Sequence, residues 1–160
     1  MTKVVPSFQQ LIRNPVHLLA FGFGSGLAPK APGTAGTLVA LLLWPMLATL
    51  PLAVYLLIVV LAAVGGFYLC GKTASDLGVH DHQGIVWDEI AGFWLAMTAV
   101  PVTWTWMLSG FILFRLFDIW KPWPIGWLDK QVGGGVGIML DDLVAGLFTW
   151  LLLFLAITFL

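Results

Sequence analysis

The chain has 160 residues, of which 60% are hydrophobic and 9% charged, and its mean hydropathy is +0.98. Because soluble globular domains carry about 25% charged residues, this composition excludes an ordinary soluble domain and indicates an integral membrane protein. The formal net charge of −1 does not indicate the basic surface that nucleic-acid binding requires. A single cysteine, Cys70, rules out an intrachain disulfide.

The N-terminal region, residues 1–33, is expected to form a cytoplasmic or interfacial arm before a helical bundle of residues 34–160. Within residues 7–20, apolar side chains such as Phe8 could form one face of a helix, although Pro15 interrupts it. Two interpretations remain open. The segment is either a helix lying in the membrane interface or an irregular arm packed on the bundle.

Three long stretches contain no Asp, Glu, Lys or Arg. They are residues 31–71, 90–114 and 143–160. A membrane-spanning helix needs about 20 apolar residues, so the first stretch is too long for one helix. Because it contains Pro45 and Pro51, we predict a hairpin of residues 34–50 and 52–71. The last stretch predicts one span that begins near Asp141.

The middle stretch allows two arrangements. It is either one helix kinked at Pro101 or two short helices, residues 86–100 and 102–120, that turn there. Only the second arrangement places all seven Lys and Arg residues on the side of the N-terminus, as the positive-inside rule favours. We therefore predict an all-α membrane bundle of about five transmembrane helices, with short outer turns and polar cytoplasmic loops.

This topology brings five carboxylates to one side of the membrane, at the ends of the third, fourth and fifth spans. They are Asp88, Glu89, Asp118, Asp141 and Asp142. Such a group repels itself unless cations compensate it. Arg115 and Lys121 each lie three residues from Asp118 and could neutralise part of the charge.

Oxygen-only ligands suit Mg²⁺, Mn²⁺ or Ca²⁺ rather than zinc, so all five carboxylates are candidate metal ligands and catalytic groups. The alternative is that they are ordinary solvated helix starts, which acidic residues favour. A position at a helix start would explain four of the acids one by one: Asp88, Glu89, Asp141 and Asp142. It would not explain Asp118, which is expected near a helix C-terminus, where an acidic side chain is unfavourable.

A histidine pair lies in a polar loop on the same side, where His80 and His82 flank Asp81. The two residues belong either to a hydrogen-bonded polar loop or to a site in which His82 donates a proton to a leaving group. The second interpretation is possible because histidine titrates near neutral pH.

Two glycine-rich segments, residues 22–26 and 133–137, also lie on this side. They could hold an anion beside a helix N-terminus, or could simply form turns. Lys30 and Thr34 would add donors to such an anion site.

Acidic groups for a hard metal, glycine-rich anion sites and basic residues together describe a phosphate site. At the headgroup level, such a site suggests a phospholipid substrate. Several segments also resemble the bacterial phosphatidylglycerophosphatase A family, small membrane lipid phosphatases. These segments are HLLAFGFGSGLAP at 17–29, PGT at 32–34, GVHDH at 78–82, IVWDE at 85–89, FRLFDIWKPWP at 114–124 and GIMLDDLVAG at 137–146.

The resemblance implies Mg²⁺-dependent removal of the terminal phosphate of phosphatidylglycerophosphate, which yields phosphatidylglycerol. It also implies a multi-pass protein of the bacterial inner membrane whose active site faces the cytoplasm. The motifs carry over the five carboxylates, with Arg115, Lys121 and Lys130 as phosphate or headgroup contacts. The expected partners are the phospholipid substrate and the membrane, with no obligatory protein partner.

As a mechanism, we expect Asp88, Asp118 and Asp142 to hold Mg²⁺, while Arg115 or Lys121 binds the phosphate. The attacking group is open at this point, because two routes fit the residues.

In the first route, either Glu89 or Asp141 activates a water molecule. In the second, one aspartate attacks the phosphorus directly.

A small ion or proton transporter is the alternative function, because transporters also place carboxylates inside helical bundles. A transporter would need acidic groups near the bilayer midplane, whereas these are expected near one face.

Overall fold

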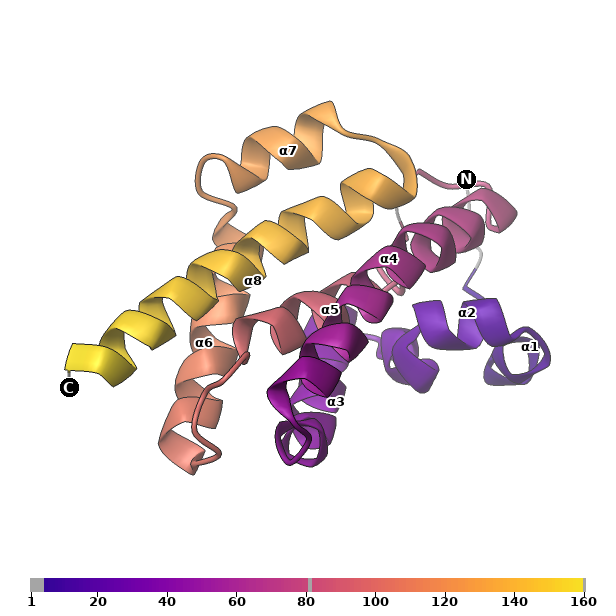
Figure 1. The fold of residues 1–160 in the computed structure, drawn as a ribbon. Coiled ribbons are helices and arrows are strands. Elements are labelled where there is room, and N and C mark those ends of the chain that lie inside the picture. Colours follow the sequence, from indigo (N-terminus) through magenta and orange to yellow (C-terminus); the bar gives the residue numbers. More distant parts are fainter. Residues whose placement is uncertain (1–4, 81, 160) are drawn as a thin grey trace.

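The computed structural model describes residues 5–80 and 82–159, and every regular element within these ranges is helical (Figure 1). This confirms the all-α prediction. The elements in chain order are α1 (Phe8–Arg13), α2 (Pro15–Ala20), the 3₁₀ helix η1 (Gly22–Leu27), α3 (Pro32–Ala48), α4 (Leu52–Asp76), α5 (Trp87–Ala96), α6 (Trp104–Trp120), α7 (Ile125–Gln131) and α8 (Gly134–Phe159).

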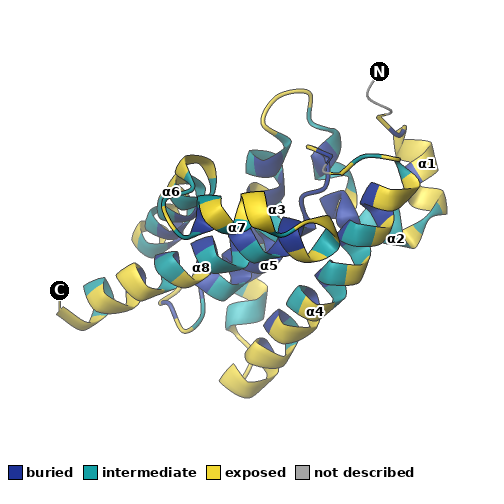
Figure 2. Cartoon of the chain, turned by 90° about the horizontal axis from the view of Figure 1, so that it is seen from above, coloured by how far each residue is buried: buried dark blue, intermediate teal, exposed yellow. Residues whose placement is uncertain are grey.

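The middle charge-free stretch forms two helices, as predicted, because α5 and α6 are separated by residues 97–103 around Pro101. However, α5 is shorter than the expected residues 86–100. Its ten residues extend about 15 Å at 1.5 Å per residue, half of a hydrocarbon core of about 30 Å. Seven of the ten are buried, so α5 is a central helix enclosed by other helices (Figure 2).

Within the described residues, two helices, α4 and α8, are long and apolar enough to cross a membrane, whereas α3 is a shorter apolar helix. The structure therefore supports two candidate spans, and the five-span topology stays a prediction. The expected start of the last span at Asp141 is wrong, since α8 begins at Gly134. In this first turn of α8, Gly135 fits against α4, since a Cβ at Gly135 would overlap the Phe67 carbonyl oxygen.

The N-terminal arm begins with two short helices rather than one. Asn14 ends α1 and caps α2, since its side-chain oxygen accepts hydrogen bonds from the N–H groups of Val16 and His17. The arm joins the bundle through His17, whose Nε2 lies 2.9 Å from Asp76 Oδ2 on α4. The interfacial position of this arm, and the division of the chain after residue 33, stay predictions.

The central helix α5 is fixed by its contacts with three neighbours. The indole of Trp87 donates a hydrogen bond to the carbonyl of Ala62 on α4, and that of Trp94 donates to a carbonyl of α3. Against α8, the backbones meet at two glycines. A Cβ at Gly146 would overlap the Gly92 carbonyl oxygen, and a Cβ at Gly92 would crowd the backbone of α8. The crossing therefore requires glycine on both helices.

Replacing a crossing glycine by alanine should separate α5 from α8. We expect Gly146→Ala to lower the free energy of unfolding by about 1–3 kcal/mol, as overpacking does. Thermal unfolding of the purified protein measures the effect. Gly65→Ala is the matched control, because a Cβ there meets nothing within 4 Å. Equal melting temperatures for the two variants would contradict a crossing that depends on glycine.

Candidate active site

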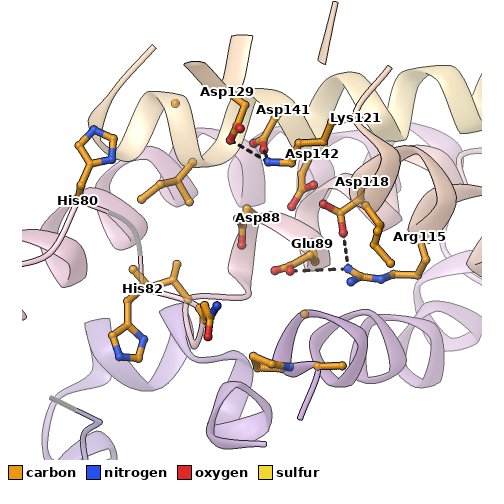
Figure 3. A pocket seen from close by; sticks show the side chains of 18 of the residues that line it. His80, His82, Asp88, Glu89, Arg115, Asp118, Lys121, Asp129, Asp141 and Asp142 are labelled. Atoms are coloured by element: carbon orange, nitrogen blue, oxygen red, sulfur yellow. Dashed lines mark hydrogen bonds and ion pairs between the residues drawn. The ribbon is translucent and has the colours of Figure 1, made fainter. Parts of the chain in front are cut away.

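A cavity of about 520 Å³ opens where the starts of α3, α5 and α8 meet the end of α6 (Figure 3). Six of the seven acidic residues within the described ranges line it, and two cations, Arg115 and Lys121, lie among them. The lining acids are Asp88, Glu89, Asp118, Asp129, Asp141 and Asp142. The structure thus brings together all five carboxylates that the sequence selected, and adds Asp129.

Three of the carboxylates converge on one point. Oxygen atoms of Asp88, Glu89 and Asp142 all lie within 4.8 Å of one another. Each of these side chains also has a buried oxygen without a hydrogen-bond partner in residues 5–80 and 82–159: Asp88 Oδ1, Glu89 Oε2 and Asp142 Oδ1. Buried polar atoms are nearly always bonded, and adjacent carboxylates repel. The trio therefore offers oxygen donors that could hold a hard divalent cation.

Arg115 projects from α6 into the same cavity. Its guanidinium forms an ion pair with Asp118, as the three-residue spacing predicted, and lies 3.7 Å from Glu89 Oε1. The same Nη1 atom lies 3.5 Å from Thr37 Oγ1 on α3. Arg115 therefore connects α3, α5 and α6 and places a positive charge next to the carboxylate trio.

Lys121 has different partners from those predicted. Its ammonium group donates to Asp129 Oδ1 at 2.8 Å and to Asp141 Oδ2 at 2.6 Å, rather than compensating Asp118. The reason is that Lys121 ends α6 in a left-handed conformation, with φ of 47°, so the helix does not continue through it. Although burial acts to lower it, the two carboxylates raise the pKa of Lys121. The side chain is therefore a permanent cation.

The position of the acids within their helices bears on the interpretation that they are solvated helix starts. Asp141 and Asp142 lie well inside α8, which begins at Gly134, and are only 6% and 2% exposed. They are therefore neither caps nor solvated helix starts. Asp88 and Glu89 do occupy the first turn of α5, where the helix dipole favours negative charge. Helix-end electrostatics can thus account only for this second pair.

The loop that contains His80 and His82 borders the cavity, but neither histidine belongs to the carboxylate trio. The ring of His82 lies 5.4 Å from that of Phe21, and its Nδ1 accepts a hydrogen bond from the Gly84 N–H at 3.0 Å. Although His82 lines the cavity, Figure 3 shows its ring turned away from the carboxylates. Its role as proton donor stays a prediction. His80 is exposed at the cavity edge, and Asp81 lies outside the described residues.

Three predicted substrate contacts do not line the cavity: Lys30, Thr34 and Lys130. Lys30 and Lys130 are exposed, and the roles of all three stay predictions. Sequence reasoning missed Asp129 because it considered only acids at span ends. The sequence did contain a signal for Asp129. It lies on the expected cytoplasmic side of the membrane, next to Lys130, which was predicted to contact the phosphate or headgroup.

Across the described residues, the protein is helical, and two of its helices are long enough to cross a membrane. Its cavity is rich in carboxylates and contains two cationic side chains. These features are typical of membrane proteins that bind or cleave phosphate groups. The sequence family Phosphatidylglycerophosphatase A matches residues 18–157. The chain belongs to this family.

Similar proteins come from several bacteria. A protein named Phosphatidylglycerophosphatase A from Escherichia coli K12 is 54% identical over 134 residues, covering 83% of this chain and 78% of its own. One of the same name from Haemophilus influenzae is 44% identical and covers 96% of each chain. A third, from Bacteroides thetaiotaomicron, has a provisional name as a phosphatidylinositol-3-phosphatase; it is 40% identical and covers 87% of this chain and 91% of its own. No solved structure shows significant similarity.

Removing one charge from the trio should stabilise the protein when no divalent cation is present. In chelator, we expect Asp142→Asn to raise the melting temperature by roughly 2–4 °C per 1 kcal/mol of relieved repulsion. Asp76→Asn is the control, because that carboxylate is paired with Lys72 and His17 outside the cavity and its loss should be neutral or slightly destabilising. A lower melting temperature for Asp142→Asn in chelator would show that the trio does not repel.

Proposed function

We propose that this protein hydrolyses the terminal phosphomonoester of phosphatidylglycerophosphate, releasing phosphatidylglycerol and inorganic phosphate. The observation that carries the proposal is the convergence of Asp88, Glu89 and Asp142 beside Arg115, within a chain of the phosphatidylglycerophosphatase A family. The names of the relatives from E. coli and H. influenzae support this substrate. A phosphomonoester needs cationic groups around its oxygens, and Arg115 and Lys121 line the cavity.

Mg²⁺ is the proposed cofactor, held by Asp88, Glu89 and Asp142. This set differs from the one expected from the sequence, which included Asp118. The carboxylates of Asp118 and Asp141 are each paired with a cationic side chain, whereas oxygens of Asp88, Glu89 and Asp142 lie within 4.8 Å of one another. When bound, a divalent cation would withdraw negative charge from the phosphoryl oxygens.

The remaining groups supply binding and proton transfer. Arg115 binds the phosphate through its guanidinium, which matches the geometry of phosphate oxygens. Hydrolysis breaks the bond between phosphorus and the terminal glycerol oxygen, while a water oxygen bonds to phosphorus and gives up a proton. Asp141, which retains a buried Oδ1 without a described partner, is the proposed base. The leaving glycerol oxygen takes a proton, for which His82 is the candidate.

Direct attack by an aspartate is the second chemical route. It would form an aspartyl phosphate, which water then cleaves. Rapid quenching after mixing with substrate labelled in the terminal phosphate distinguishes the routes, because only the second leaves label on the protein.

We also propose that the protein lies in the bacterial inner membrane with the cavity facing the cytoplasm. The separation of α5 from α6 supports this orientation, since it is the arrangement in which all basic residues share the side of the N-terminus. Because α5 is too short to cross alone, residues 97–103 complete its path toward the outer surface.

Phosphate release from purified protein tests the function. We expect release from phosphatidylglycerophosphate in Mg²⁺, with loss of activity in chelator and recovery on adding Mg²⁺ back. Asp88→Asn should lower kcat about 100-fold or more, since it removes a charge from the proposed cation site. Full activity in chelator would refute the metal requirement, and no release from this lipid under any condition would refute the substrate.

Arg115 provides a separate test of phosphate binding. We expect Arg115→Gln to lower kcat/KM by about 100-fold to 1,000-fold, in the range for loss of one transition-state contact. The matched control is Arg13→Gln, which removes the same side chain from an exposed position at the end of α1. If both variants retain wild-type kcat/KM, Arg115 does not bind the reacting phosphate.

A further inference from the structure

The rim of the active-site cavity divides into a polar part and an apolar part. Six of the described lining residues are exposed and so form this rim. The polar rim residues are His80, Gln83 and Asp129, and the apolar rim residues are Pro29, Ala31 and Ile119. An amphiphilic substrate would meet water on the first side and a nonpolar surface on the second.

The apolar rim lies between the start of α3 and the end of α6, two helices that are in direct contact. Arg115 Nη1 of α6 lies 3.5 Å from Thr37 Oγ1 of α3, and a Cβ at Gly33 would collide with the Glu89 carboxylate and approach Arg115. Ile119 is one helical turn beyond Arg115. A phosphate held by Arg115 would therefore lie next to the apolar rim.

Exposed apolar side chains continue from this rim along both helices. On α6, Ile112 and Leu116 are 54% and 49% exposed and lead to Ile119, which is 70% exposed. On α3, Leu38 and Leu42 are 44% and 75% exposed. Large exposed apolar side chains in such a row are typical of a lipid-facing or ligand-binding region.

We propose that the diacylglycerol end of the substrate leaves the cavity between α3 and α6, across Ala31 and Ile119, so that its acyl chains lie along the exposed apolar side of α6. This inference rests on the proposed function, because it requires a phosphate attached to a lipid. Removal of each acyl methylene from water is favourable, so the chains favour the apolar rim over the polar one. The polar rim then faces the aqueous phase, into which inorganic phosphate is released.

The test compares two substrates with the same headgroup in the full-length protein. One is dioleoyl phosphatidylglycerophosphate in mixed micelles, and the other is its dibutyryl analogue, free in solution. We expect Ile119→Asn to lower the ratio of kcat/KM values, long-chain over short-chain, by about tenfold, as loss of an apolar contact predicts. The decrease should come from a higher KM for the long-chain lipid rather than from a lower kcat.

A second variant probes the opposite side of the rim without endangering the fold. Ala31 precedes α3 with φ of 48°, a left-handed conformation that asparagine tolerates, and asparagine is a favoured helix N-cap. Ala31→Asn should therefore fold normally and lower the same ratio. Leu57→Asn is the control for a polar group on a lipid-facing helix, because Leu57 is 57% exposed on α4 and does not line the cavity. Its ratio should equal that of the wild type.

The outcomes separate this inference from the proposed function. A wild-type ratio in both Ile119→Asn and Ala31→Asn would overturn the inferred lipid path, and so would equal losses on the two substrates, which indicate a purely structural role. Failure of the wild type to hydrolyse either substrate would instead overturn the proposed function. Hydrolysis with a selective rise in the long-chain KM supports both.

Discussion

The close crossing of α5 and α8 at Gly92 and Gly146 is the contact on which the site depends. Asp88 lies four residues before Gly92, and Asp142 lies four residues before Gly146, so each carboxylate is one helical turn from the crossing. Because neither glycine has a side chain, the two backbones meet directly. That approach brings the two carboxylates, and the adjacent Glu89, within 4.8 Å of one another. A wider crossing would separate Asp142 on α8 from Asp88 and Glu89 on α5.

Each of the cavity acids outside the trio forms an ion pair with one of the two cations. Arg115 pairs with Asp118, whereas Lys121 pairs with Asp129 of α7 and Asp141 of α8. Among the described residues, the trio approaches a cation where Arg115 Nη1 lies 3.7 Å from Glu89 Oε1, a longer distance than in the other ion pairs of the cavity. Concentrating uncompensated negative charge in a buried place is unfavourable for the protein alone. Such an arrangement is typical of functional sites, where a bound cation compensates the charge.

Much of the site could be predicted because charge is rare in this chain. With only eight acids in 160 residues, those at the borders of apolar stretches stood out, and all five that were selected lie in the cavity. Pro101 and the distribution of basic residues predicted that the middle stretch forms two helices. The start of α8 was not predictable in this way, because it includes Gly135, which fits closely against the backbone of α4.

The sequence by itself determined the helical class, the family motifs and five of the six acids that line the cavity, since hydropathy and charge are read directly along the chain. Apart from the Arg115–Asp118 pair, which the three-residue spacing predicted, only the tertiary structure decided which partners those acids have. Lys121 binds Asp129 and Asp141 because the left-handed end of α6 turns the chain toward α7 and α8. The trio keeps its unmet charge because the glycine crossing of α5 and α8 holds it together, and no local pattern encodes the distance between two helices.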